Sequence, residues 1–406
     1  MNAQTATRPT SALQTPALPT AKPEQLGLSS LRLQRMSDSF KREVDKGTIP
    51  GATVLVARRG QIGWFDAIGR QAPEGAPMAH DTIFRIFSMT KPIVSVGIMM
   101  LLEDGQLLLS DPVAKFIPEF AETKVGVEHN GKLELEPASR QMTIQDLLRH
   151  TSGLTYDHTG NGLVQQLYQQ SRLRSRKITN AEHATLLASM PLICQPGAEF
   201  NYSRSTDILG RIIEVISGKT LGAFLTERIL APLQMTETAF YTGEENASRL
   251  AEAFATDPWN GEKVQLFNML EKPAMESGGG GLVSTTMDYA RFAQMLLSGG
   301  ALDGTRIIGR KTLQLMASDH LGPDVKIQGA LVPPGHGFGL GFAVRTHQGI
   351  APFPGSVGQF FWSGVAGTFF WIDPVEDLFA VFMSQGPGQR DYTRTLVRNG
   401  VYAALD

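Results

Sequence analysis

A serine and a lysine stand three residues apart in the segment Ser88-Met89-Thr90-Lys91. Residues at this spacing share one face of a helix, so the Lys91 amine can reach the Ser88 hydroxyl. A serine becomes a nucleophile when a neighbouring base takes its proton, and a lysine whose pKa is lowered by burial and nearby positive charge can be that base. About one Ser-x-x-Lys match is expected by chance in a chain of this length, so the neighbouring motifs decide its meaning.

Tyr202 is a second residue that could move a proton. It follows a turn at Gln195-Pro196-Gly197 and precedes an expected helix. A phenol beside a lysine ammonium loses its proton more easily and can act as a general base. A core tyrosine with a satisfied hydroxyl would give the same local pattern.

A third segment, from Phe361 to Thr368, combines aromatic residues with small ones. Small residues let a strand edge approach a substrate closely, and a free backbone N–H there could stabilise an oxyanion. The structural alternative is a glycine-rich β-bulge beside a packed tryptophan.

The composition is that of an ordinary globular protein. The 406 residues are 42% hydrophobic and 19% charged, and the formal net charge of −2 gives no electrostatic case for nucleic acid or an anionic membrane as a partner. Cys194 is the only cysteine, which excludes an intrachain disulfide and a cysteine-rich metal site. No apolar run is long enough to span a bilayer, and the start of the chain does not resemble a signal peptide. We therefore expect a cytoplasmic protein with a disordered tail over residues 1–24.

The expected helices and strands indicate an α/β (α+β) fold with an inserted helical domain. One domain would cover 25–106 and 251–406, and its antiparallel sheet would join N-terminal and C-terminal strands between flanking helices. Residues 107–250 would form the mostly helical insertion, with the active site between the two domains. The elements expected from periodicity and turn residues are helices at 28–46, 88–105, 208–216, 221–230, 285–297 and 390–405, and strands at 52–57, 62–67, 338–345, 364–373 and 378–384.

These motifs, taken in order, resemble those of the serine β-lactamase and penicillin-binding-protein superfamily. The resemblance runs from about Leu28 to the C-terminus and is greatest to the family VIII carboxylesterases, which share the class C β-lactamase fold. Supporting stretches lie at 147–154, 279–285, 338–342 and 367–374.

Two departures separate this chain from the β-lactamases of the superfamily. Class C enzymes carry Tyr-x-Asn in the second motif, whereas Arg204 occupies the asparagine position here. They carry Lys-Thr-Gly in the third, where this chain has Trp362-Ser363-Gly364. A tryptophan cannot bind the β-lactam carboxylate as the lysine does, and its apolar indole suits an uncharged ester.

The resemblance implies acyl transfer through a covalent ester on Ser88. The implied function is a serine carboxylesterase that hydrolyses short- to medium-chain uncharged esters, with a small-molecule ester as its partner and no cofactor or metal ion. Lys91 and Tyr202 would share the proton transfers, and the backbone N–H groups of Ser88 and Val365 would form the oxyanion hole. The expected substrate contacts are Trp362, Ser363, Gly364, Tyr156 and His336.

Other functions fit parts of the pattern. A β-lactamase, a D-amino-acid peptidase or an acyltransferase would use the same residues, and a non-catalytic binding protein could keep the fold. The chain has no Gly-x-Ser-x-Gly, the nucleophile elbow of Ser-His-Asp hydrolases, and no His-Glu-x-x-His. The glycines at 278–281 lack the lysine of a phosphate loop, and His150 is expected to be structural. Nothing in the sequence indicates the oligomeric state.

Overall fold

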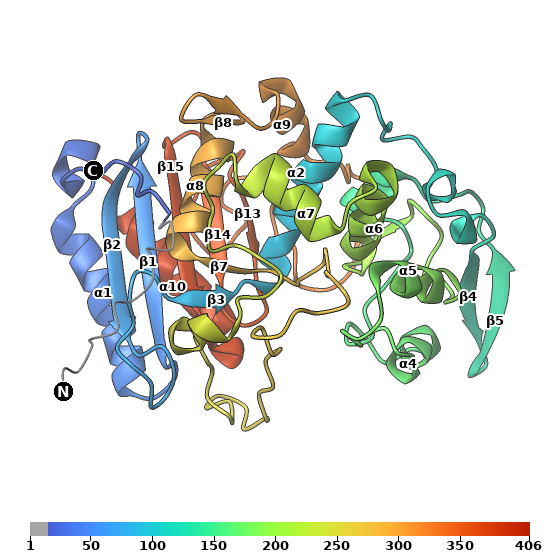
Figure 1. Ribbon diagram of the computed structural model, residues 1–406, viewed down its shortest axis with the longest axis horizontal. Helices are drawn as coiled ribbons and strands as arrows, with labels where there is room; N and C mark the ends of the chain where they lie inside the picture. The colour runs from blue at the N-terminus through green and yellow to red at the C-terminus, as the bar shows by residue number, and fades with distance from the viewer. Residues whose placement is uncertain (1–14) are drawn as a thin grey trace, which may run out of the picture.

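The central element is a large antiparallel sheet (Figure 1). The computed structural model describes residues 15–406. The strands of this sheet are β1 (Gly51–Arg58), β2 (Gln61–Gly69), β11 (His336–Phe338), β12 (Ala343–Arg345), β13 (Phe360–Ser363), β14 (Phe369–Asp373) and β15 (Leu378–Ser384). They lie in the order β11-β12-β13-β14-β15-β1-β2, so that the N-terminal hairpin joins the C-terminal strands through the β1–β15 pair. The predicted fold class is confirmed.

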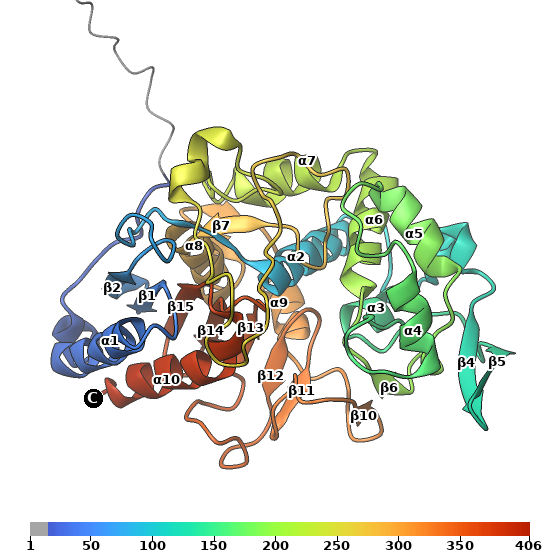
Figure 2. The same cartoon turned by 90° about the horizontal axis from the view of Figure 1, so that it is seen from below.

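Helices cover both faces of the sheet. The helices α1 (Ser30–Asp45) and α10 (Arg390–Ala403) pack together on one face, and α8 (Thr286–Leu297) packs on β14 and β15 from the other (Figure 2). Every residue of β15 is buried as a result. This explains why its sequence is a nearly continuous apolar run and not an alternating one.

A second region, formed within residues 107–250, lies on the other side of α2 (Thr90–Glu103) (Figure 1). Its helices are α3 (Ile144–Leu148), α4 (Leu163–Gln170), α5 (Asn180–Ala188), α6 (Ser205–Ser217) and α7 (Leu221–Leu225), and α7 continues as a π-helical turn over Thr226–Leu230. The hairpin of β4 (Lys124–His129) and β5 (Lys132–Pro137) is not part of the expected pattern, because its strands are largely exposed and highly charged. The domain boundaries themselves stay a prediction.

The remaining elements are short. The strand β3 (Ile83–Arg85) pairs with β7 (Val283–Thr285), and this pair anchors the segment that precedes α2. The others are β6 (Glu199–Phe200), β8 (Ala301–Leu302), β9 (Thr305–Arg306), β10 (Lys326–Ile327), α9 (Arg310–Met316), and 3-10 turns at Pro23–Leu26, Phe87–Met89, Val113–Lys115, Pro118–Phe120, Glu244–Arg249 and Pro387–Gln389.

The expected disordered tail over residues 1–24 is wrong for its second half. Leu18 is buried, and Thr20 forms a parallel β-bridge with Ile62 at the outer edge of β2. The backbone of Ala21 donates a hydrogen bond to the Ile62 carbonyl at 3.0 Å. The segment is mostly polar in sequence, so neither the burial of Leu18 nor the pairing with the edge strand β2 could be recognised from its composition. Residues 1–14 lie outside the described residues.

Two expected strands of the C-terminal part are interrupted by turns. The strand expected over 338–345 divides into β11 and β12 because the chain reverses at Gly339–Gly341, where Gly341 has a φ of 98°. The strand expected over 364–373 begins only at Phe369. Residues before it form a turn that is closed by a hydrogen bond from the Gly364 N–H to the Thr368 carbonyl at 2.8 Å.

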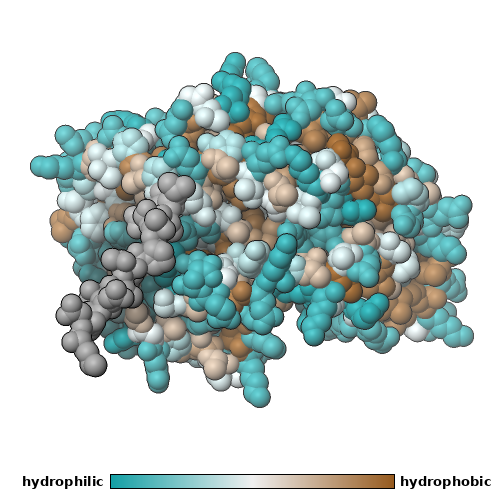
Figure 3. Space-filling view, viewed as in Figure 1, coloured by the Kyte–Doolittle hydropathy of each residue, from teal (hydrophilic) through white to brown (hydrophobic). Residues whose placement is uncertain are grey.

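The surface shown in Figure 3 is mainly hydrophilic, with hydrophobic residues confined to scattered patches. Within residues 15–406, no helix combines the length and apolar character needed to cross a bilayer.

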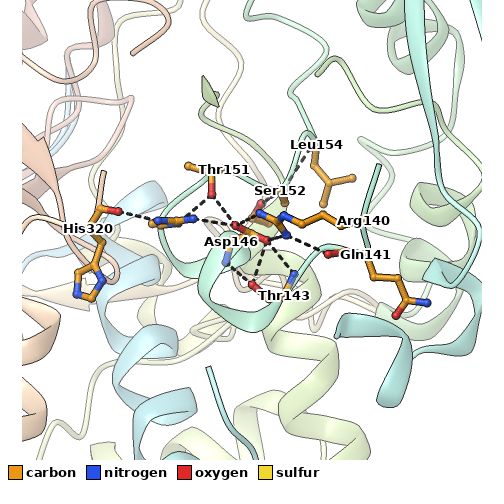
Figure 4. A network of polar contacts seen from close by, with 10 residues as sticks. Arg140, Gln141, Thr143, Asp146, Thr151, Ser152, Leu154 and His320 are labelled. Carbon is orange, nitrogen blue, oxygen red and sulfur yellow. Dashed lines mark hydrogen bonds and ion pairs between the residues drawn. The ribbon is translucent and has the colours of Figure 1, made fainter. Parts of the chain in front are cut away.

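A buried carboxylate organises the chain between α3 and the segment at 150–153 (Figure 4). Asp146 accepts two hydrogen bonds from the Arg140 guanidinium, at 2.6 and 3.0 Å, and one from Arg149 at 3.1 Å. It also accepts hydrogen bonds from the Thr143 N–H and the Thr151 hydroxyl. Burial alone would raise the pKa of Asp146, but these partners, Arg140 first, outweigh burial and lower it.

We expect Asp146→Asn to lower the free energy of unfolding by about 3 kcal/mol at neutral pH, because the variant leaves two guanidinium groups without their counter-charge. Urea denaturation followed by fluorescence measures this change. Since the pKa of Asp146 is lower in the folded than in the unfolded protein, the difference from wild type should persist above about pH 4 and shrink as the pH falls further. The exposed Asp38→Asn serves as control and should change stability little; equal losses in the two variants would contradict the role of the network.

Candidate active site

Ser88 lies in the 3-10 turn immediately before α2, and Lys91 is the second residue of that helix. The turn is fixed from two sides. The preceding strand β3 pairs with β7, and the Met89 carbonyl accepts a hydrogen bond from the buried Tyr289 hydroxyl at 2.9 Å. In this position Lys91 Nζ lies 3.3 Å from Ser88 Oγ. The structure thus brings together the two residues that the sequence pairs.

Lys91 is buried, with 1% of its surface exposed, and its ammonium contacts three oxygen atoms. Besides Ser88, Nζ donates to the Gly279 carbonyl at 2.6 Å and to the Tyr156 hydroxyl at 3.1 Å. Burial lowers the pKa of Lys91 to about 7, against the attraction of Asp207 and with the help of Arg204. A lysine with this pKa is present in both protonation states at neutral pH and can therefore take a proton from Ser88.

Asp207, on the first turn of α6, fixes the peptide that holds Lys91. Its Oδ1 accepts hydrogen bonds from the Gly279 N–H at 2.9 Å and the Ser277 hydroxyl at 2.6 Å. The carbonyl of the same glycine receives the Lys91 ammonium. Asp207 is buried and its pKa is lowered, because nearby cationic and hydrogen-bonding groups outweigh the burial that would raise it. No motif in the sequence marks this residue, although it follows Tyr202 by only five positions.

Tyr202 lies between Lys91 and the third motif. Lys91 Nζ is 4.5 Å from the centroid of its ring, and the Trp362 indole N–H donates to its hydroxyl at 3.2 Å. Burial raises the pKa of Tyr202, while Ser88 and Trp362 act in the opposite direction. Tyr202 therefore carries its proton at neutral pH, unlike Lys91, which titrates there.

His150 supports the segment that carries Tyr202. Its carbonyl accepts a hydrogen bond from the Asn201 N–H at 2.8 Å, and its Nδ1 lies 3.2 Å from the Ser203 hydroxyl. The imidazole packs 4.7 Å from the Tyr202 ring, measured between centroids. Burial lowers its pKa, and so does the charge of Lys91. His150 thus stays neutral and positions its neighbours.

Val365 lies in the turn between β13 and β14, beside the segment that leads to Ser88. The Thr368 hydroxyl donates to the Ile86 carbonyl at 3.2 Å, and a Cβ on Gly364 would lie 2.5 Å from the same oxygen. Only glycine permits this approach of the two backbones. Val365 itself is 48% exposed, and the role of its N–H in an oxyanion hole stays a prediction.

Arg394, near the start of α10, holds this turn from behind. Its Nη2 donates to the Gly364 carbonyl at 2.6 Å, and its Nη1 donates to Asp391 at 3.2 Å. Burial lowers the pKa of Arg394 to about 10, while Asp391 acts against this shift. No motif in the sequence marks this arginine, because its role depends on a contact with a residue 30 positions away.

The remaining predicted substrate contacts separate into two groups. Tyr156 touches Lys91, and Trp362, Ser363 and Gly364 lie on β13 and the turn that follows it. His336 is not brought to Ser88. Its ring contacts Phe361 and Phe353, and Phe361, as the neighbour of Trp362 in β13, points to the opposite face of the sheet.

Arg204, at the position where class C enzymes have asparagine, is paired inside the protein. It is buried, and its Nη2 donates to Asp157 at 3.1 Å. Arg174 contacts the same carboxylate. Among residues 15–406, no three His, Cys, Asp or Glu side chains gather into a group that could hold a metal ion.

The sequence profile described as Beta-lactamase matches residues 36–402, which is most of the chain. The chain belongs to the beta-lactamase family. It is 36% identical over 357 residues to Protein Rv1367c of Mycobacterium tuberculosis, covering 86% of this chain and 88% of that protein. It is 29% identical over 399 residues to Esterase EstB of Burkholderia gladioli, covering 91% and 95%.

A solved structure described as EstCE1, a hydrolase with promiscuous acyltransferase activity, has a TM-score of 0.75 to this beta-lactamase family member. The two chains are 25% identical, and the match covers 92% of this chain and 99% of that one. Together with the similarity to EstB, this confirms two predictions from the sequence. The protein is a family VIII-type member of the serine β-lactamase superfamily, and it is an enzyme of the carboxylic ester hydrolase type.

For this family member, we expect kcat/KM on p-nitrophenyl butyrate to rise as the pH increases through about 7. The reason is that Lys91, whose pKa is about 7, must lose its proton before it can accept one from Ser88. Lys91→Ala should lower kcat/KM by about 10³-fold and remove this pH limb. Lys115→Ala, a change at an exposed lysine, is the control. A wild-type profile that is flat between about pH 6 and 8 would assign the base to another group.

We expect Arg394→Met to lower kcat by about 10- to 100-fold with little change in KM. Without its guanidinium the turn at Gly364–Val365 should loosen, and if the Val365 N–H is the predicted oxyanion donor, its displacement destabilises the transition state more than the bound substrate. Steady-state kinetics measure both constants. Arg390→Met, on the same helix, is the matched control; a change confined to KM would indicate that Arg394 contacts substrate.

Proposed function

We propose that this protein is a serine carboxylesterase that hydrolyses short- to medium-chain uncharged esters through an acyl-Ser88 intermediate. The observation that carries the proposal is the contact of Ser88 with a buried lysine whose pKa is about 7. The similarity to EstB, which is named an esterase, supports the choice of ester over amide.

In the proposed acylation step, Lys91 takes the Ser88 proton as Oγ attacks the ester carbonyl. The oxyanion is stabilised by the N–H groups of Ser88 and Val365. Tyr202 keeps its proton at neutral pH and lies beside both groups, so it can donate to the leaving alcohol and regain a proton from Lys91. The net result is one new ester bond to Ser88 and one released alcohol.

In deacylation, a water molecule attacks the acyl-Ser88 carbonyl, and Lys91 with Tyr202 again carries the proton. The acid is released and the proton returns to Ser88 Oγ, which completes the cycle.

The proposed preference for uncharged substrates rests on the polar and cationic side chains around the site, which are already bonded to other protein groups. The Trp362 indole donates to Tyr202, Arg204 is neutralised by Asp157, and Arg394 is bonded to Gly364 and Asp391. None of these groups offers a free cation to the carboxylate that β-lactams and peptides present. Placing such a carboxylate here would therefore cost desolvation without a compensating pair.

An acyltransferase is the second candidate. An alcohol that replaced water in deacylation would use the same residues, and the structural relative EstCE1 is described as a hydrolase with promiscuous acyltransferase activity. Adding an alcohol acceptor during turnover separates the two, because transfer yields a new ester while hydrolysis yields the acid.

The test compares p-nitrophenyl butyrate with nitrocefin as substrates for wild type, Ser88→Ala and the control Ser39→Ala. We expect ester turnover that Ser88→Ala reduces by at least about 10³-fold, little nitrocefin cleavage, and a butyryl adduct on Ser88 by mass spectrometry of the quenched enzyme. Dominant nitrocefin cleavage would identify a β-lactamase instead, and ester turnover that survives in Ser88→Ala would overturn the assignment of the nucleophile.

A further inference from the structure

Phe87, the residue bonded to the nucleophile, has an unusual backbone conformation. Its φ of 44° lies in the left-handed region that residues other than glycine rarely adopt. Gly280 is a neighbour of this backbone, since a Cβ added there would make ordinary van der Waals contact with the Phe87 carbonyl carbon, at 3.5 Å. The side chain remains partly exposed. A strained position next to the nucleophile therefore carries a large apolar ring that the core does not fully enclose.

A second ring, from a distant part of the chain, covers the first. Phe267 lies 5.6 Å from Phe87, measured between ring centroids, with 37° between the ring planes. It comes from the loop between 251 and 276, which contains no helix or strand. Despite this contact Phe267 remains 43% exposed.

Two arginines also contact Phe267. Its carbonyl accepts a hydrogen bond from Arg85 Nε at 2.6 Å, and the Arg176 guanidinium lies 5.2 Å from the centroid of its ring. Arg85 also donates to the Ala251 carbonyl and pairs with Glu252, which ties the beginning of the loop to β3. An exposed aromatic ring that two side chains contact, and whose backbone a third holds, is a preorganised apolar surface, with less ordering entropy to lose when a ligand covers it.

We propose that Phe87 and Phe267 form an apolar wall of the substrate site, which binds the hydrocarbon part of the ester and sets the chain-length preference. The inference rests on the proposed esterase function and names the substrate class that the same site would select: esters with an extended alkyl or aryl group. Because Phe87 is bonded to Ser88, its backbone adjoins any group attached to the acyl-serine, and the proposal places its ring against that group. A hydrocarbon chain bound against this wall would remove from water the part of Phe267 that is exposed in the free protein.

The test measures kcat/KM for two substrate series on wild type, Phe267→Ala and Phe267→Leu. One series lengthens the acyl chain of p-nitrophenyl esters from acetate to hexanoate, and the other lengthens the alcohol of butyrate esters from methyl to hexyl. In one of the series, we expect kcat/KM of the wild type to rise by up to about fourfold for each added methylene. In Phe267→Ala, the ratio of kcat/KM for the longest substrate to that for the shortest should fall by about tenfold, and Phe267→Leu should restore most of this ratio.

The series that flattens identifies the wall as the acyl or the alcohol subsite, and either result supports the proposal. Trp259→Ala is the matched control, since Trp259 is in the same loop and is 73% exposed. Unchanged ratios in Phe267→Ala, or an equal loss on every substrate, would overturn the proposal and leave Phe267 a structural residue.

A measurement without turnover separates this proposal from the proposed function. Boronic acids with methyl to hexyl groups bind active-site serines as tetrahedral adducts, and calorimetry gives their Kd for each variant. A chain-length dependence of Kd that is lost in Phe267→Ala supports the wall even if ester hydrolysis fails. Because the alkyl group of a boronic acid takes the place of the acyl chain, a dependence that is equal in both proteins, together with unchanged ratios in the alcohol series, overturns the proposal even if hydrolysis is found.

Discussion

The site depends on keeping one ammonium group away from water. Lys91 Nζ donates hydrogen bonds to the oxygens of Gly279, Tyr156 and Ser88 in place of water, and removing the hydration shell from a cation favours its neutral form. A solvated lysine, with a pKa of about 10.4, would stay charged at neutral pH and could not take the proton from the serine hydroxyl. The geometry of the surrounding elements follows from this requirement, since each of them closes one side of the space around Nζ.

Three segments from distant parts of the chain meet around this lysine, and main-chain hydrogen bonds set their positions. The nucleophile turn is anchored by the pairing of β3 with β7, the Tyr202 segment by the carbonyl of His150, and the turn after β13 by the carbonyls of Ile86 and Gly364. Backbone anchors leave the side chains around the substrate free to differ. This is how one fold can support esterases, acyltransferases and β-lactamases with the same central residues.

The sequence predicts those parts of the structure that local patterns determine. Two strand-forming runs separated by a short turn predicted the hairpin of β1 and β2, and the i, i+3 spacing predicted the contact between Ser88 and Lys91. The sequence could not reveal Arg394, Asp207 or Phe267, because each acts on a residue far from it in the chain. His336 was predicted to contact substrate, but its side chain lies on the other face of the sheet. Which face a strand residue occupies depends on how the strands pair, and the sequence alone does not specify this pairing.

The closure of the sheet by its last strand has a consequence for biosynthesis. The Ser384 hydroxyl bonds to the Gly51 carbonyl, 333 positions earlier, so the centre of the sheet is assembled from the two ends of the chain. Contacts of such high sequence separation form slowly, because a long loop must be closed before they contribute. On the ribosome, β1 would remain without its partner β15 until the final strand emerges. The nascent protein therefore passes through a long aggregation-prone stage, during which a chaperone has more to protect than in a fold built from neighbouring segments.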